Sequence, residues 1–192
     1  QDQMLRLLEQ LGLQNVFVLP QVRVDDKVTV GSNTHFICAQ PFLGASFEEM
    51  VRRGAKPIFA PFPFGASGTT AWLRAICDVF GVEKETFEAV TDAPRRRAEI
   101  AIEKVSKILI DRSVFFFPDS QLEIPLARFL NQECGMKLIE VGSPYIHRQV
   151  VGPDLELLPE GIIISEGQDV DKQLDRVFDR VPDLTVCGLG LA

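Results

Sequence analysis

The stretch SVFFFPDSQLEIPLARFLNQECGMKLIEVG, residues 113–142, changes its hydrophobic pattern twice. Residues 113–118 form an apolar run rich in Phe and Val, which is typical of a buried strand. Residues 120–135 space their apolar side chains as a helix does and end on a glycine, and residues 136–142 form a second apolar run. A strand, a helix and a strand in this order indicate a parallel sheet with a helical crossover.

The same alternation continues on both sides of this stretch. Towards the C-terminus we expect strands at 161–165 and 184–188 and a helix at 169–181. Towards the N-terminus we expect strands at 15–20, 34–40 and 56–60, a turn-rich loop at 61–68, and helices at 2–11, 45–54, 69–81 and 83–110. The sequence therefore predicts an α/β protein with two Rossmann-like units, mainly parallel sheets and a long joining helix.

The long helical tract sets the predicted domain boundaries. We expect a first Rossmann-like unit at 1–90, a connecting helix at 91–111 and a second unit at 112–192. The chain opens with QDQMLRLL and stops after an apparent strand at VCGLGLA. From these ends we expect a piece of a longer polypeptide, with the first unit incomplete and the second truncated.

Two helix starts carry the pattern of a capping box, in which a hydroxyl and a carboxylate bind the free amides of the first turn. Ser46 and Glu49 form one pair, and Ser120 and Glu123 form the other. Asp119 adds negative charge at the same end of the second helix. These groups predict a closed, structural turn after Pro118 and not a phosphate cradle, which leaves its amides open.

The composition limits the kinds of partner that the protein can bind. The net charge is −7 over 192 residues and the pI is about 4.9, which disfavours a nucleic-acid partner. No apolar run approaches the roughly 20 residues of a membrane span, and we expect a cytoplasmic protein. The four cysteines are far apart in sequence and predict buried apolar side chains, with no local metal motif: Cys38, Cys77, Cys134 and Cys187.

Nothing in the sequence predicts a catalytic residue, because the common phosphate, zinc and nucleophile motifs are missing. The candidates for ligand contact follow expected strands, at the edge where open α/β sheets bind ligands. They are Gly188, Gly190, Glu166, Gln168 and Asp169. The structural alternatives are a tight turn for the two glycines and a helix cap for Asp169.

Two other features have a structural and a functional interpretation. His35 and His147 have no nearby base or nucleophile in sequence and predict structural roles. The basic run at 95–97 predicts a solvated helix face, with docking to an acidic partner as the alternative.

Several stretches together resemble the N subunits of light-independent (dark-operative) protochlorophyllide reductases, which are nitrogenase-like. They run in order along the chain: THFICAQPFLG, APFPFGASGTTAWL, FFFPDSQLEIPLARFLNQECGMKLIEVGSPYIH, SEGQDVDKQLDRV and PDLTVCGLGLA. The resemblance implies one part of a catalytic component that reduces the C17=C18 bond of protochlorophyllide ring D to give chlorophyllide. It implies a B subunit as partner in a heterotetramer, and an ATP-hydrolysing iron–sulfur L protein that docks transiently and delivers electrons from ferredoxin.

The resemblance also implies a [4Fe-4S] cluster at the interface of the two subunits. None of the four cysteines matches the family's cluster ligands, so we expect the ligands outside this chain and no activity from this piece alone. Two rival functions remain open at this point. One is a bilobal small-molecule-binding or regulatory module, and the other is a nucleotide-sugar transferase of two-Rossmann design.

Overall fold

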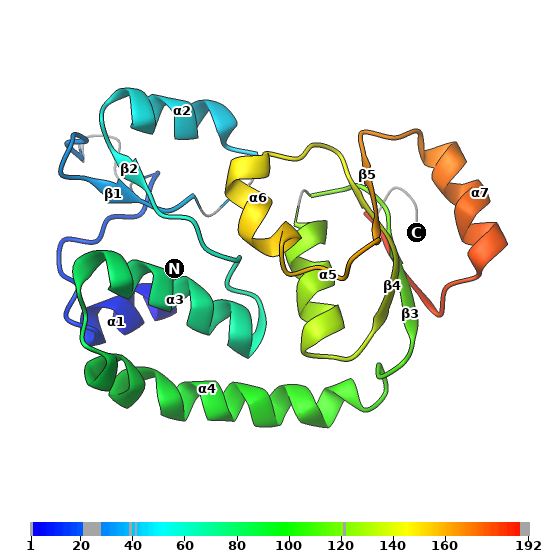
Figure 1. Cartoon of the computed structure of the whole chain (residues 1–192), viewed down its shortest axis with the longest axis horizontal. Coiled ribbons are helices and arrows are strands. Elements are labelled where there is room, and N and C mark those ends of the chain that lie inside the picture. The colour runs from blue at the N-terminus through cyan, green and yellow to red at the C-terminus, as the bar shows by residue number, and fades with distance from the viewer. Residues whose placement is uncertain (1, 21–27, 39, 41, 121, 189–192) are drawn as a thin grey trace.

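The computed structural model describes residues 2–20, 28–38, 40, 42–120 and 122–188. Two parallel sheets form, a small one in the N-terminal part and a larger one in the C-terminal part, and helix α4 runs along one side of the molecule between them (Figure 1). The predicted α/β class with parallel sheets is confirmed. The domain boundaries at 90 and 111 stay a prediction.

The C-terminal sheet has the strand order β5-β4-β3-β6, and all neighbouring strands are parallel. Helices α5 and α6 contact each other on one side of this sheet, and α7 lies on the other side (Figure 1). The strands are β3 Ser113–Phe116, β4 Lys137–Ser143, β5 Ile163–Glu166 and β6 Leu184–Val186. The helices are α5 Glu123–Gln132, α6 Arg148–Leu155 and α7 Val170–Arg180.

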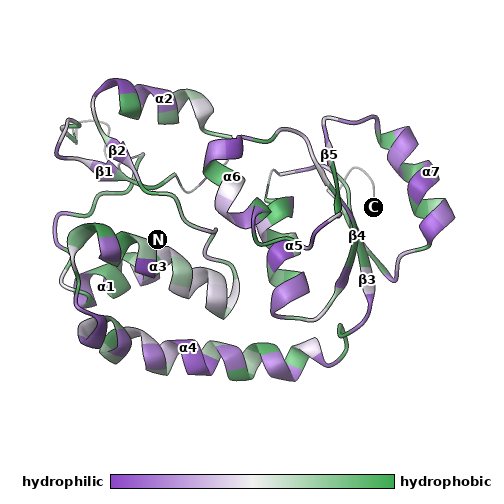
Figure 2. Ribbon diagram, viewed as in Figure 1, coloured by the Kyte–Doolittle hydropathy of each residue, from purple (hydrophilic) through white to green (hydrophobic). Residues whose placement is uncertain are grey.

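Strand β3 is a central strand covered on both faces. Val114, Phe115 and Phe116 are fully buried, which explains why the sequence shows a continuous apolar run there and no alternation. In Figure 2 the helices carry both hydrophilic and hydrophobic colours, as expected of helices that cover a sheet with one face. The apolar stretch quoted first is therefore the centre of the C-terminal core.

The N-terminal sheet is shorter than predicted. It pairs β1 His35–Phe36 with β2 Lys56–Pro57, so the expected strands 34–40 and 56–60 are paired over two residues each. The amides of Lys56 and Ile58 donate towards β1, at 2.9 and 2.7 Å, so the missing amide hydrogen of Pro57 lies on the other edge of β2 and disfavours a further strand there. The expected strand at 15–20 is absent from the structure: Phe17 and Leu19 are exposed there, and β-type residues without a neighbouring strand do not form one.

The helices of the N-terminal part are α1 Asp2–Gln10, α2 Gly44–Arg52, α3 Gly65–Phe80 and α4 Lys84–Ser106. Helices α1, α3 and α4 contribute to a second core, whereas α2 contacts β2. Helix α3 begins inside the stretch that we expected to be a loop (61–68), so that prediction is wrong for its last four residues. Pro94 lies within α4, which continues through it.

The structure confirms only part of the predicted helix capping. Helix α2 begins at Gly44, which places Ser46 inside its first turn without a capping hydrogen bond, and Glu49 binds Arg52 and Arg53 instead. The capping box at Ser46 and Glu49 is therefore wrong.

At α5 the capping prediction is half right. The Glu123 carboxylate accepts hydrogen bonds from the amides of Asp119 and Ser120 at 2.8 and 2.6 Å, as expected. Ser120 is not the cap residue, because the helix begins later, after Leu122. Its hydroxyl accepts from the Leu122 amide at 3.3 Å.

Asp169 caps α7 as predicted, since its carboxylate accepts a hydrogen bond from the Asp171 amide at 3.0 Å. We expect Asp169→Ala to lower the free energy of unfolding by about 1 kcal/mol, the usual contribution of such a cap. Urea unfolding followed by circular dichroism measures it. Asp169→Asn keeps a capping oxygen and should lose much less; equal losses from both substitutions would argue against a capping role.

Helix α6 was not predicted at all. It contains Gly152 and Pro153, which disfavour a helix locally, but Val150, Val151 and Asp154 are buried against the rest of the C-terminal part. Tertiary packing overrides local propensity here.

Among the described residues, none of the helices has the length and apolar character needed to traverse a bilayer.

Candidate functional site

The order of the C-terminal sheet identifies one place where a ligand crevice can form. Strands β3, β4 and β5 step outward in one direction, whereas β6 returns to the other side of β3. The direction in which successive strands are added therefore reverses between β3 and β6. In open α/β sheets ligands bind at the carboxyl ends of the strands, at the point where the strand order reverses.

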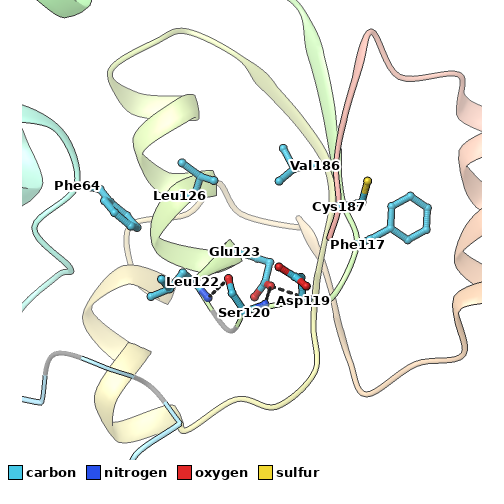
Figure 3. A pocket seen from close by; sticks show the side chains of 9 residues that line it. All are labelled: Phe64, Phe117, Asp119, Ser120, Leu122, Glu123, Leu126, Val186 and Cys187. Carbon is cyan, nitrogen blue, oxygen red and sulfur yellow. Dashed lines mark hydrogen bonds between the residues drawn. The ribbon is translucent and has the colours of Figure 1, made fainter. Parts of the chain in front are cut away.

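A cavity of about 200 Å³ lies at this point (Figure 3). Its walls come from the ends of β3 and β6, from the start of α5, and from one residue of the N-terminal part, Phe64. The lining residues are Phe64, Phe117, Asp119, Ser120, Leu122, Glu123, Leu126, Val186 and Cys187. The lining is mixed, with apolar side chains and a small polar group at one end.

The polar end of the cavity is organised by Glu123. Because this carboxylate holds two backbone amides of the turn, the turn is closed, as the sequence predicted. Asp119 also lies at this end, next to Gly188: a Cβ atom added to Gly188 would collide with the Asp119 carboxylate. The chain after β6 thus passes close to the cavity, and a glycine permits the close approach.

The other predicted contact residues have structural partners. Glu166 accepts a hydrogen bond from the Ile146 amide at 2.9 Å, and Gln168 accepts one from Arg176 at 2.9 Å. Asp169 caps α7, and Gly190 lies outside the described residues. Of the five candidates, the structure therefore brings Gly188 next to the cavity.

A buried polar cluster, which the sequence did not reveal, fixes the wall that carries Phe64. The Arg128 and Asp154 side chains are 1% and 0% exposed, and Arg128 Nε donates to Asp154 Oδ1 at 2.6 Å. Arg128 Nη2 also donates to the carbonyls of Phe62 and Phe64 at 2.9 and 3.2 Å, and the Phe62 amide donates to Asp154 Oδ2 at 2.8 Å. We call these groups the Arg128–Asp154 cluster.

Glu133 completes the attachment at the start of α3. Its carboxylate accepts hydrogen bonds from the amides of Ala66 and Ser67 at 2.6 and 3.2 Å, and from the Ser67 hydroxyl at 2.6 Å. The free amides of α3 are thus capped by a residue about 67 positions away in the chain. No local pattern could have predicted this cap.

A second ion pair, with a buried carboxylate and a partly exposed guanidinium, lies on the α7 side of the sheet. Glu140 on β4 is fully buried and accepts two hydrogen bonds from Arg176 at 2.7 Å, with a further bond from Ser165 at 2.6 Å. Burial alone raises the pKa of Glu140, but the bonds from Arg176, Ser165 and Gln173 outweigh it, so its pKa lies below the ordinary value.

This lowered pKa gives a pH prediction. When the folded-state pKa lies below the unfolded one, the stabilisation is fully present above the unfolded pKa of about 4.3, and it disappears as the pH falls through the folded value. We expect wild type to exceed Glu140→Gln in free energy of unfolding by about 1.5–3 kcal/mol near neutral pH, and the gap to close in acid.

Urea unfolding across that pH range measures the gap. Glu49→Gln is the control. Hydrogen bonds from Arg52 and Arg53 lower the pKa of Glu49 to about 2, but this carboxylate lies on an exposed surface, where solvent screening weakens the pair. We therefore expect Glu49→Gln to change the free energy of unfolding much less than Glu140→Gln does. A pH-independent gap for Glu140→Gln would contradict the role assigned to the Arg176 pair.

The cysteines do not supply an iron–sulfur ligand set. Cys77 belongs to the N-terminal core and Cys134 to the C-terminal core, and burial raises the pKa of both thiols. Within the part of the chain that the structure describes, no group of three or more His, Cys, Asp and Glu side chains is placed to hold a metal ion. The described residues therefore do not form a complete ligand set for the cluster that the resemblance implies.

Comparison with known proteins supports one family. Subunit N of light-independent protochlorophyllide reductase from Jannaschia sp. (strain CCS1) is 61% identical over 192 residues, and the proteins of the same name from Dinoroseobacter shibae and Roseobacter denitrificans are 62% and 58% identical. Each match covers all of this chain and 45% of the relative, so the chain spans about half the length of the curated relatives it matches. Residues 2–190 match the family described as nitrogenase component 1 type oxidoreductase. The chain therefore belongs to the nitrogenase component 1 type oxidoreductase family.

Proposed function

We propose that this chain is part of the N subunit of a light-independent protochlorophyllide reductase. The observation that carries the proposal is the 58–62% identity, over all 192 residues, to three proteins with that name. The matched range covers the whole chain and therefore spans every segment that lines the cavity.

The finer parts of the proposal come from the family resemblance. The assembled enzyme reduces the C17=C18 bond of protochlorophyllide ring D with electrons from ferredoxin, in a step that depends on ATP hydrolysis by the L protein. The chain pairs with a B subunit in a cytoplasmic heterotetramer. A [4Fe-4S] cluster of the assembled enzyme supplies the electron-transfer chemistry, and its ligands lie outside the described residues.

This chain contributes a wall that positions the substrate and excludes water from it. A volume of about 200 Å³ is below the roughly 300–1,000 Å³ of sites that enclose a drug-sized ligand, so the cavity can form only one wall of a site for a tetrapyrrole. Apolar side chains such as Leu126 and Val186 exclude water from that wall, and the closed turn at Glu123 keeps its shape. A rigid wall that fixes the substrate relative to the electron donor accelerates the reaction through positioning.

We propose Gly188 as the substrate-facing position of this wall, because the structure brings it next to the cavity. Gly190, Glu166, Gln168 and Asp169 remain candidates from the sequence. No residue of this chain is proposed as the proton donor.

The full-length subunit tests the proposed function. Assembled with its partner subunit and supplied anaerobically with the iron–sulfur L protein, ATP and an electron donor, it should convert protochlorophyllide into chlorophyllide in the dark. The product is identified by absorbance and mass spectrometry. Omission of the subunit is the control, and product formation that does not require it would refute the proposal.

Gly188→Val gives a test at the level of the site. Three added carbon atoms next to Asp119 narrow the approach to the cavity, so we expect the KM for protochlorophyllide to rise roughly tenfold, as about 1.4 kcal/mol of lost binding produces. Gly31→Val is the control, because nothing lies within 4 Å of the Gly31 Cβ position, its backbone is not left-handed, and it precedes β1 in the N-terminal part. An equal KM for both variants would contradict the assignment of Gly188.

A further inference from the structure

The cavity at the end of β3 and β6 has one wall that does not belong to the sheet or its helices. Phe64 lies between β2 and α3, in the N-terminal part of the chain, yet it is one of the residues that line the cavity (Figure 3). The shape of the site therefore depends on how this segment is attached to the C-terminal part.

The attachment is polar and buried. Arg128 binds the carbonyls on both sides of Pro63, those of Phe62 and Phe64, and Asp154 binds the Phe62 amide, so three backbone groups of the segment are held by one ion pair. Gly68 leaves room for this arrangement, since a Cβ there would collide with the Arg128 guanidinium and the Phe62 carbonyl. The guanidinium is planar and presents several donors in a fixed geometry, which lysine cannot reproduce.

Stability alone does not explain such a cluster. A buried ion pair costs desolvation energy that its attraction barely offsets, and well-packed apolar residues often stabilise as much or more. What the ion pair adds is a single geometry for the groups that it binds. Here those groups are the backbone atoms that set the position of the Phe64 ring.

We propose that Arg128 and Asp154 are positioning residues for substrate binding, and that they act by holding Phe64 as a wall of the cavity. The inference rests on the proposed function, because the ligand of that wall is taken to be protochlorophyllide. Neither residue touches the cavity itself; among the residues of this cluster, only Phe64 does.

The test uses the full-length subunit assembled with its partner and measures the dissociation constant for protochlorophyllide by pigment fluorescence. Phe64→Ala removes the wall and should weaken binding roughly tenfold. Arg128→Lys keeps the charge but loses the multiple backbone bonds, and we expect a similar loss with a raised KM and little change in kcat.

Two further variants separate positioning from general stability. Arg176→Lys makes the same substitution in the Glu140 ion pair, which lies on the other side of the sheet, and should leave pigment binding unchanged. If Arg128 acts through Phe64, the double variant Arg128→Lys/Phe64→Ala should bind about as weakly as Phe64→Ala alone, whereas independent effects would multiply.

The outcomes are distinct. Failure of the wild-type enzyme to bind protochlorophyllide would overturn the proposed function, and with it the identity of the ligand. If the wild type binds, unchanged binding by Arg128→Lys, or multiplied effects in the double variant, would overturn the positioning role. Should Arg128→Lys fail to assemble, Asp154→Asn, which keeps an acceptor for the Phe62 amide, is measured in the same cycle against Phe64→Ala.

Discussion

Asp154→Ala is expected to lower the free energy of unfolding by about 3–5 kcal/mol, because it leaves the buried Arg128 guanidinium without its hydrogen-bonded carboxylate and with only that of Glu133, at 3.8 Å. It also removes the acceptor of the Phe62 amide, which then lies buried next to an apolar side chain. Urea unfolding of the chain, followed by far-ultraviolet circular dichroism, measures the loss.

A paired substitution is the control for this prediction. Arg128→Met/Asp154→Leu removes both charges together and should recover part of the stability, although the carbonyls of Phe62 and Phe64 lose their bonds from Arg128. A loss below about 1 kcal/mol for Asp154→Ala would mean that solvent reaches the pair and that the cluster is not closed.

Gly65→Ala is expected to have the second largest effect, about 2–4 kcal/mol. Gly65 begins α3 with φ +72°, and a Cβ there would overlap the Phe129 ring and the Glu133 carboxylate that caps the helix. Left-handed backbone costs about 1–2 kcal/mol for an L-residue, and overpacking adds about 1–3 kcal/mol. Trp72, the single tryptophan, is buried on the same helix, so its fluorescence reports the unfolding.

Gly81 supplies the matched comparison for Gly65. It ends the same helix with φ +65°, but nothing lies within 4 Å of its Cβ position. Gly81→Ala should therefore show the backbone cost alone, about 1–2 kcal/mol. Equal losses at the two positions would show that the contact with Glu133 and Phe129 yields without cost.

The C-terminal half of the fold could be predicted because its signals are local. The apolar runs of β3, β4 and β5 are long enough to be recognised, and α5 and α7 show helical spacing between them. The N-terminal half was predicted less well for physical reasons. Its strands pair over two residues each. The amides at the start of α3 are capped by Glu133, which follows α5, and not by a residue close to them in sequence.

The residues of the candidate site divide in the same way, into those that the sequence could indicate and those that only the fold brings together. The carboxyl edge of the sheet and Gly188 could be indicated by the sequence, because Gly188 follows an expected strand. Arg128 and Asp154 could not be identified in this way, since each is a single charged residue on a helix and only the fold brings them together with Phe62. Helix α6, which carries Asp154, was missed because Gly152 and Pro153 mask its pattern.

Membership of the nitrogenase component 1 type oxidoreductase family favours the proposed function over the two alternatives left open by the sequence. A bilobal binding module and a nucleotide-sugar transferase share the alternation of strands and helices, so the architecture alone does not separate them from an oxidoreductase. The match over residues 2–190 does.

The central claim is that the cavity between the ends of β3 and β6 faces protochlorophyllide, and Cys187 in its wall is a direct probe. In the assembled enzyme, the rate at which a maleimide labels Cys187 is measured by peptide mass spectrometry with and without protochlorophyllide. Cys38, also partly exposed, is the internal reference. The account predicts that the pigment slows labelling of Cys187 and leaves Cys38 unchanged; equal labelling of Cys187 in both conditions, with the pigment bound, would contradict it.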